Sequence, residues 1–252
     1  MIQQTALITG ASSGIGEALA YELANRGYNL VLIARRKQQL EFVQQKVMQI
    51  GRQATLIIAD LTDDGQLEAL TTQISQIQVH LLILNAGMGQ SGSYMERDSE
   101  TEAQMTKLNI DANIKLTRAM LPQMLNRQNG GILFVSSVLA FYPSPYMTTY
   151  AATKAFIQSY GESLAIELAP AGIQVSILCP GSTSSEFAMQ SGFTQKQAMS
   201  ATKVAQIAIK HHLHGKRVII PGYHNRALAR LTHLMPKKLL DPLMEKLFRP
   251  RK

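Results

Sequence analysis

The chain lacks several features that mark particular classes of protein. It contains 1 cysteine, Cys179, so it forms no internal disulfide and fits a reducing cytosol, where we expect this side chain to be buried at a strand end. No uninterrupted apolar run reaches about 18 residues, so we expect no membrane-spanning helix. The first residues do not combine a basic segment with an apolar stretch, so we expect no signal peptide and a cytoplasmic location.

Aromatic residues are scarce, at 6% of the chain with no Trp. The basic residues lie among aliphatic side chains and not among aromatic rings on which bases could stack, so we do not expect nucleic-acid binding. Hydrophobic residues still reach 46%, which is enough for a large core. No repeat, low-complexity stretch or long linker divides the 252 residues, which suit one domain.

The order of apolar segments predicts the fold class. Helical segments separate short strands, which we expect near residues 5–9, 28–34, 53–59, 79–84, 131–136, 173–178 and 217–220. Regular alternation of strand and helix is typical of α/β proteins. The sequence therefore predicts a doubly wound parallel sheet of about seven strands with helices on both faces.

A glycine-rich turn follows the first strand. The segment Gly10-Ala-Ser-Ser-Gly14-Ile-Gly16 precedes a helical run at Glu17–Arg26. Gly10 permits a tight turn, Gly14 lets backbone approach a pyrophosphate, and Gly16 lets the helix pack closely on the sheet. The helix N-terminus adds free N–H groups and the positive end of its dipole. We therefore expect a dinucleotide to contact Gly10, Ser12, Ser13, Gly14, Ile15 and Gly16.

The end of the second strand indicates which dinucleotide is bound. An NAD site usually has an acidic residue about 20 residues beyond the glycines, where it binds the ribose hydroxyls. Arg35 occupies that place here and Arg36 follows it. A guanidinium suits a 2′-phosphate, so we expect NADP(H) in preference to NAD(H).

A tyrosine and a lysine stand four residues apart in Tyr150-Ala-Ala-Thr-Lys154, and Ser137 lies 13 residues before the tyrosine. If residues 149–169 are helical, Tyr150 and Lys154 share one face. An ammonium beside a phenol favours the phenolate, so we expect Lys154 to lower the pKa of Tyr150 towards neutrality. Such a phenol could exchange a proton with a substrate oxygen that Ser137 holds, which suits carbonyl–alcohol chemistry. The spacing alone is also compatible with an ordinary amphipathic helix.

Taken together, these motifs resemble the short-chain dehydrogenase/reductase (SDR) family. The matching pieces cover residues 5–187 and run in family order: Thr9 to Gly16, Asp60-Leu61, Asn85-Ala86-Gly87, Asn109, Ser136-Ser137, Tyr150-x-x-x-Lys154 and Pro180-Gly181. The resemblance implies a single Rossmann-type NAD(P)-binding domain over residues 1–252, with strand order 3-2-1-4-5-6-7. A basic amphipathic C-terminal extension at 223–252 would be attached to it.

The resemblance also implies roles for single residues. Tyr150 would be the general acid in carbonyl reduction, and Ser137 would orient the carbonyl. Lys154 would tune the phenol and hold the nicotinamide ribose, while Asn109 would keep a water in a proton relay through Lys154. Further cofactor contacts are implied for Asp60, Leu61, Asn85, Ala86, Gly87, Pro180, Gly181 and Thr183.

Two positions depart from the family pattern. Leu84 replaces the first Asn of the usual Asn-Asn-Ala-Gly, and Ser185 stands where a Thr often follows the Pro-Gly pair. The first leaves Asn85-Ala86-Gly87 in place. The second weakens the assignment of a cofactor contact at position 185.

The residues that follow the active-site strands predict an apolar substrate pocket. They carry no charged anchor: Met88, Val138, Leu139, Phe141, Tyr142, Tyr146, Phe187, Met189 and Phe193. We expect an apolar carbonyl substrate, such as a 3-oxoacyl thioester, a long-chain or cyclic ketone, or an aldehyde. The stretch Ser182–Ser200 is a candidate lid.

The net charge of +8 arises in the C-terminal part of the chain, because residues 203–252 hold 12 of the 25 basic residues and 2 of the 17 acidic ones. Within this part, residues 227–235 and 239–248 mix apolar and basic residues at roughly helical spacing. Such a segment packs on its own domain or on a sister subunit, or it rests on an anionic membrane surface or an acidic carrier protein. Many SDR proteins form dimers or tetramers through helices that correspond to 101–126 and 150–169, so the resemblance permits a homo-oligomer.

Two other interpretations remain at this stage. The chain could bind NADPH as a non-catalytic sensor or interaction protein, or it could act mainly through its tail at a membrane. His211, His212 and His214 lack the spacing of a metal site and are expected to be a solvated helix end, so no metal is predicted.

Overall fold

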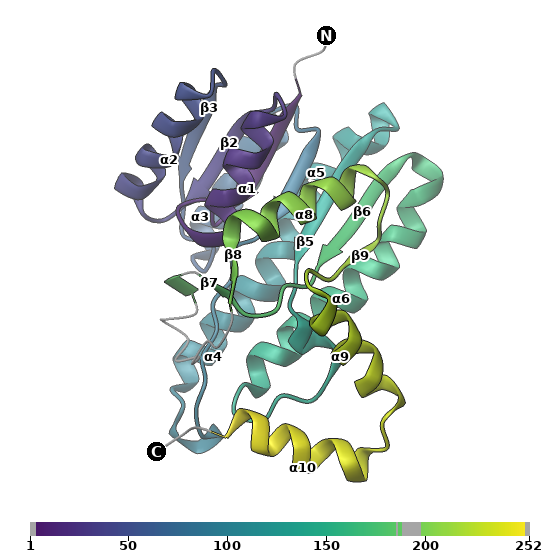
Figure 1. The fold of residues 1–252 in the computed structure, drawn as a ribbon. Helices are drawn as coiled ribbons and strands as arrows, with labels where there is room; N and C mark the ends of the chain where they lie inside the picture. Colours follow the sequence, from purple (N-terminus) through teal and green to yellow (C-terminus); the bar gives the residue numbers. More distant parts are fainter. Residues whose placement is uncertain (1–3, 185, 188–197, 250–252) are drawn as a thin grey trace.

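The computed structural model describes residues 4–184, 186–187 and 198–249. A seven-stranded sheet forms the centre of the molecule (Figure 1). Its strands are β1 (Thr5–Thr9), β2 (Asn29–Ala34), β3 (Ala54–Ile58), β4 (Leu81–Leu84), β5 (Gly130–Val135), β6 (Ile173–Leu178) and β9 (Val218–Ile219). Their spatial order is β3-β2-β1-β4-β5-β6-β9, and every pair of neighbours is parallel. The predicted fold class and strand order are confirmed.

Helices cover both faces of this sheet, because alternate residues of each buried strand point to opposite faces. In β1, Ala6 and Ile8 pack with one group of helices, and Leu7 packs with the other. The first group is α1 (Gly14–Asn25), α2 (Lys37–Gln49) and α8 (Ala201–Leu213). The second is α3 (Asp64–Ser75), α5 (Ala112–Arg127) and α6 (Thr148–Leu168).

The predicted boundaries agree closely with these elements. The helix expected at 149–169 is α6, and the helix expected from Glu17 begins three residues earlier, at Gly14. The sequence did not indicate the short sheet of β7 (Thr183–Ser184) and β8 (Met199–Ser200). It also did not indicate the π-helical turn Lys107–Asp111 that joins α4 (Ser99–Thr106) to α5.

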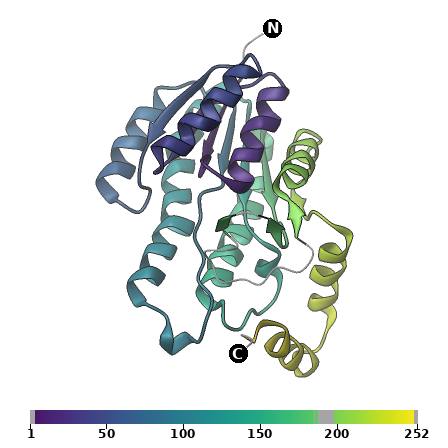
Figure 2. The same cartoon turned by 60° about the vertical axis from the view of Figure 1, so that its left-hand side comes forward.

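The C-terminal segment forms two helices, α9 (Tyr223–Leu234) and α10 (Lys237–Phe248). Both lie at the end of the molecule remote from α2 (Figures 1 and 2). Leu240 and Met244 of α10 are buried in a third apolar cluster, which also contains Tyr142 and Tyr150. One face of the tail therefore packs on the chain itself.

Within the described residues, no helix has the length and apolar character needed to cross a bilayer.

Candidate active site

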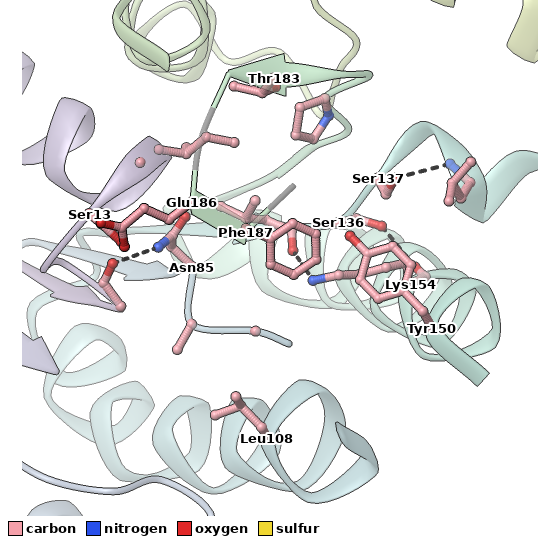
Figure 3. Close-up of a pocket in the computed structure, with 18 of the residues that line it drawn as sticks. Ser13, Asn85, Leu108, Ser136, Ser137, Tyr150, Lys154, Thr183, Glu186 and Phe187 are labelled. Atoms are coloured by element: carbon pink, nitrogen blue, oxygen red, sulfur yellow. Dashed lines mark hydrogen bonds between the residues drawn. The ribbon is translucent and has the colours of Figure 1, made fainter. Parts of the chain in front are cut away.

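A cleft of about 720 Å³ opens beyond the carboxyl ends of the strands. In a doubly wound sheet this edge binds the ligand, at the point where the strand order reverses, and here β1 and β4 are neighbours at that point. Ser13 and Asn85 lie towards one end of the cleft, and Ser137 and Tyr150 lie towards the other (Figure 3). The predicted site residues that line it are Gly10, Ser12, Ser13, Gly14, Ile15, Arg35, Arg36, Asp60, Leu61, Asn85, Ala86, Gly87, Ser137, Tyr150, Lys154, Pro180, Gly181 and Thr183.

The glycine turn has the geometry of a phosphate cradle. Gly10 and Gly14 have φ values of +64° and +60°, a region that favours glycine. Gly16 does not line the cleft, but a Cβ there would lie 2.2 Å from the carbonyl oxygen of Gly10. The helix N-terminus can therefore approach the turn only because position 16 has no side chain.

The Asn85 side chain links the glycine turn to the end of β4 by hydrogen bonds. Its Nδ2 donates to the carbonyl oxygens of Thr9 at 3.0 Å and Gly10 at 3.2 Å. In return, the Thr9 Oγ1 accepts hydrogen bonds from the backbone N–H groups of Asn85 and Ala86, both at 3.0 Å. These bonds satisfy the buried polar groups where the two strands end, and so they fix the floor of the cleft.

Arg35 and Arg36 both line the cleft, but they have different partners. Arg35 is exposed and pairs with the Asp60 carboxylate at 3.3 Å. Burial opposes ionisation of Asp60, yet hydrogen bonds from Thr62 and Arg35 outweigh burial and hold its pKa below the usual value. Arg36 reaches the glycine turn itself, where it donates to the Ser13 Oγ at 2.8 Å and the Ser12 Oγ at 3.3 Å.

Arg36 also forms an ion pair with Glu186 at 2.8 Å. Glu186 lines the cleft and follows β7, so this pair joins the glycine-turn side to the opposite wall. The sequence did not identify Glu186, because no local pattern indicates a contact across 150 residues. A dinucleotide phosphate would compete with this carboxylate for the Arg36 guanidinium.

The catalytic candidates come from the end of β5 and the first turns of α6. The Ser137 hydroxyl accepts a hydrogen bond from the backbone N–H of Leu139 at 3.1 Å and lies close enough to the Tyr150 phenol to act on its pKa. The Lys154 Nζ donates to the carbonyl oxygen of Val135 at 3.0 Å. All three side chains are buried, with exposed fractions of 8%, 7% and 5% for Ser137, Tyr150 and Lys154.

The prediction that Lys154 lowers the pKa of Tyr150 is wrong for this arrangement. Burial raises the pKa of the Tyr150 phenol, and the nearby Ser137 hydroxyl only partly opposes that shift. Burial also lowers the pKa of Lys154 to about 8. Both side chains are removed from water, which shifts each of them towards its neutral form, and the Lys154 Nζ lies 5.6 Å from the centroid of the Tyr150 ring.

Asn109 does not line the cleft but lies behind it, in the π-helical turn. Its Oδ1 accepts from the Met88 N–H at 3.0 Å, and its Nδ2 donates to the Met88 carbonyl at 2.9 Å and the Thr153 hydroxyl at 3.0 Å. A Cβ on Gly87 would lie 3.2 Å from the Asn109 Oδ1 and 3.3 Å from the Lys154 Nζ. Asn109 therefore holds the Gly87–Met88 segment against α6. Such π-turns occur frequently at functional sites.

The end of the cleft beside Tyr150 is largely apolar. Val138, Leu139, Tyr142 and Phe187 line it as expected, whereas Met88, Phe141 and Tyr146 do not. The Phe187 ring packs on Tyr150 with 5.6 Å between centroids, and Gly89 leaves room for both rings. Met189, Phe193, Ser185 and most of the candidate lid lie outside the described residues.

Several lining residues were not predicted from the sequence. Met147, Asn225, Leu247 and Phe248 complete the cleft, and three of them belong to the C-terminal extension. The amphipathic pattern of residues 239–248 indicated a helix with an apolar face. The pattern did not indicate which part of the chain that face would cover.

The remaining candidates lie away from the cleft. Cys179 is buried just after β6, as expected, with its Sγ 3.0 Å from the Gln158 Oε1. The expected solvated helix end at 211–214 is wrong in part, since His212 is buried with its Nδ1 2.9 Å from the Ser176 Oγ. Among the described residues, no three His, Cys, Asp or Glu side chains form a metal-binding group.

Comparisons with known proteins agree with this geometry. The family model described as short chain dehydrogenase matches residues 4–196. A short chain dehydrogenase of the fungus Pseudocercospora fijiensis is 34% identical over 187 residues, which are 73% of this chain. The match covers 60% of that relative, so the chain spans about three-fifths of the length of this curated protein.

Two solved structures cover almost the whole chain. A short-chain dehydrogenase from Sphingobium yanoikuyae in complex with NADPH is 32% identical, with a TM-score of 0.86 and coverage of 99% of this chain and 98% of that one. An alcohol dehydrogenase from Comamonas testosteroni, described as specific for bulky-bulky ketones, is 31% identical, with a TM-score of 0.83 and coverage of 100% and 98%.

Proposed function

The chain belongs to the short chain dehydrogenase family, and we propose that it is an NADPH-dependent reductase of apolar ketones, aldehydes or 3-oxoacyl thioesters. As a family member it is an oxidoreductase that acts on CH–OH and C=O groups with a nicotinamide cofactor. One observation carries the proposal: the neighbouring hydroxyls of Ser137 and Tyr150 lie at the apolar end of a cleft whose other end is a glycine turn.

The cleft residues fit a dinucleotide. The positive φ values of Gly10 and Gly14 expose backbone N–H groups at a helix N-terminus, which is a site for phosphate. Arg35 and Arg36 offer two guanidinium groups that suit a 2′-phosphate, and Arg35 is already paired with the Asp60 carboxylate. When bound, the reduced nicotinamide supplies hydride to the substrate carbon.

The residues of the chain supply the proton. We propose that Tyr150 gives its phenolic proton to the carbonyl oxygen while Ser137 donates a hydrogen bond to that oxygen. Burial keeps Tyr150 protonated, so the phenol carries the proton that reduction of a carbonyl requires. Lys154 would then return a proton towards Tyr150. Its lowered pKa, about 8, makes it a ready proton donor at neutral pH.

The role of Asn109 in a water relay stays a prediction. Its side-chain amide is already bonded to Met88 and Thr153, which supports a positioning role for that amide. An oligomer through α5 and α6 and a cytoplasmic location also stay predictions.

The lining of the cleft supports the proposed substrate class. Val138, Leu139, Tyr142, Phe187 and Phe248 lie around the hydroxyl pair, and none of them carries a charge that would pair with a charged substrate group. Oxidation of NADPH should be followed with bulky ketones, aldehydes, 3-oxoacyl thioesters and small keto acids, with cofactor binding measured separately. Turnover of the apolar carbonyls is expected. A preference for small charged keto acids would refute the substrate class, and NADPH binding without any turnover would identify a non-catalytic binder.

A further inference from the structure

Helix α10 presents apolar side chains in two directions. Leu240 and Met244 are buried against the domain, with exposed fractions of 5% and 1%. Leu239, Leu243 and Leu247 lie at intervals of four residues and so form one stripe along the helix. Their exposed fractions are 64%, 46% and 59%. Packing on the domain therefore explains only one of the two apolar faces.

Helix α9 has a similar outer stripe. Tyr223, Leu231 and Leu234 have exposed fractions of 68%, 54% and 83%. Their separations of eight and three residues place them on one side of the helix. Two consecutive helices thus carry six large exposed apolar side chains, which we call the outer stripes.

Cations accompany the outer stripes. Residues 223–249 contain six basic residues, Arg226, Arg230, Lys237, Lys238, Lys246 and Arg249, against the acidic Asp241 and Glu245. Glu245 is already engaged, because it pairs with Arg249 at 2.6 Å and accepts a hydrogen bond from the Tyr146 hydroxyl. The surface that displays the leucines is consequently positive.

We propose that α9 and α10 dock the protein on an anionic lipid surface. Exposed leucines beside lysine and arginine side chains are the chemistry of helices that lie in the membrane interface: apolar groups enter the acyl boundary and cations meet the lipid phosphates. A second copy of the chain is a less suitable partner for the outer stripes, because a symmetric contact would bring the positive surfaces of the two copies together.

Helix α10 connects this surface to the cleft. Leu247 belongs to an outer stripe and also lines the cleft, and Phe248 follows it there. Docking would therefore hold the apolar end of the cleft beside the lipid, where an apolar substrate is concentrated. This consequence rests on the proposed function, whereas the docking itself does not.

Co-sedimentation with lipid vesicles tests the docking without any need for turnover. The full chain should pellet with phosphatidylcholine vesicles that contain phosphatidylserine, and much less with phosphatidylcholine alone, with added salt releasing it. The variant Leu239→Ser/Leu243→Ser should lower the partition coefficient about tenfold or more, since two inserted leucines are lost. The variant Arg230→Gln/Lys238→Gln/Lys246→Gln should lower it about fivefold for each cation, about a hundredfold in all.

Matched controls come from α2, at the far end of the molecule (Figures 1 and 2). Met48→Ser removes a side chain that is 59% exposed, and Lys46→Gln removes an exposed cation, so both should partition like the wild type. Failure of the wild type to pellet, or equal binding to neutral vesicles, would overturn the proposal. So would a fall in molecular mass of the leucine variant by light scattering with vesicle binding unchanged, because the stripes would then join copies of the chain.

Discussion

The Lys154 Nζ lies 5.6 Å from the centroid of the Tyr150 ring, over its face, and donates to the carbonyl oxygen of Val135. The two residues are neighbours on α6, as their spacing predicted. Burial acts on both groups and favours the protonated phenol. This supports the proposed mechanism, in which Tyr150 gives a proton and Lys154 replaces it.

Replacement of Tyr150 by Phe should abolish most of the turnover. The change removes the proposed proton donor and keeps the ring that packs on Phe187, so kcat should fall by about 10²–10⁴ while NADPH binding persists. Steady-state kinetics and fluorescence titration measure the two effects. Tyr160→Phe removes a phenol from the same helix outside the cleft and should change turnover little. Near-normal kcat in Tyr150→Phe would mean that another group donates the proton.

The lysine should leave a signature in the pH dependence of stability. Its pKa is about 8 in the folded chain and 10.5 as an ordinary lysine. Between pH 8 and 10.5 the unfolded chain holds more proton on this lysine than the folded chain does. The contribution of Lys154 to the free energy of unfolding therefore rises with pH above about 8, and this gain is lost as pH falls through 8. In guanidinium titrations, the free energy of unfolding of the wild type minus that of Lys154→Met should increase from pH 7 to 9.5. A difference that stays constant over this range would contradict the shifted pKa.

Cofactor preference should depend on the arginines at the end of β2. Arg35→Asp places a carboxylate where a 2′-phosphate would lie, and the ratio of kcat/KM for NADPH over NADH should fall about 10–100-fold. Arg35→Ser separates the loss of the cation from repulsion by the new charge. Lys46→Asp makes the same change of charge on the exposed side of α2 and should leave the ratio unchanged. An unchanged ratio in both Arg35 variants would show that Arg35 does not contact the phosphate.

Because the glycine turn is closely packed, a larger residue at position 16 should lower both the stability of the chain and its affinity for NADPH. Gly16→Ala puts a Cβ 2.2 Å from the Gly10 carbonyl oxygen, so the free energy of unfolding should fall by about 2–3 kcal/mol and NADPH affinity should fall with it. At Gly65 in α3, a Cβ would lie 3.5 Å from the nearest atom, the Asp63 Oδ1. Gly65→Ala should thus keep or slightly raise stability, by about 0.4–1 kcal/mol. Equal stability of the two variants would argue against the close contact.

The C-terminal contribution to the cleft should appear in substrate affinity. Phe248→Ala removes an apolar wall beside Tyr142, so KM for bulky ketones should rise about 10-fold with little change in NADPH affinity. Leu239→Ala shortens an exposed residue of the same helix and should leave KM for water-soluble ketones unchanged. If Phe248→Ala lowers NADPH affinity instead, the aromatic ring serves the cofactor end of the cleft.

Some features of the site could be predicted because they are local. The glycine turn requires special backbone angles within seven residues, and the Tyr150–Lys154 pair requires only one helical turn. Glu186 and Phe248 were missed because their contacts, with Arg36 and Tyr142, cross 150 and 106 residues, and nothing in the neighbouring sequence marks the partner. Asn109 was found through the resemblance, but its bonds to Met88 and Thr153 depend on a π-turn that no periodicity indicated.

The sequence by itself determined the order of strands and helices, the family and the position of the cleft. The spacing of apolar residues and the positions of glycines are properties of short segments. A parallel α/β sheet then brings the carboxyl ends of its strands to one edge, where the cleft lies. Only the tertiary structure decided that Tyr150 is held protonated, that Arg36 reaches the glycine turn and that α10 closes the cleft. Those outcomes depend on which groups lose water and which distant side chains meet, and these are properties of the packed chain.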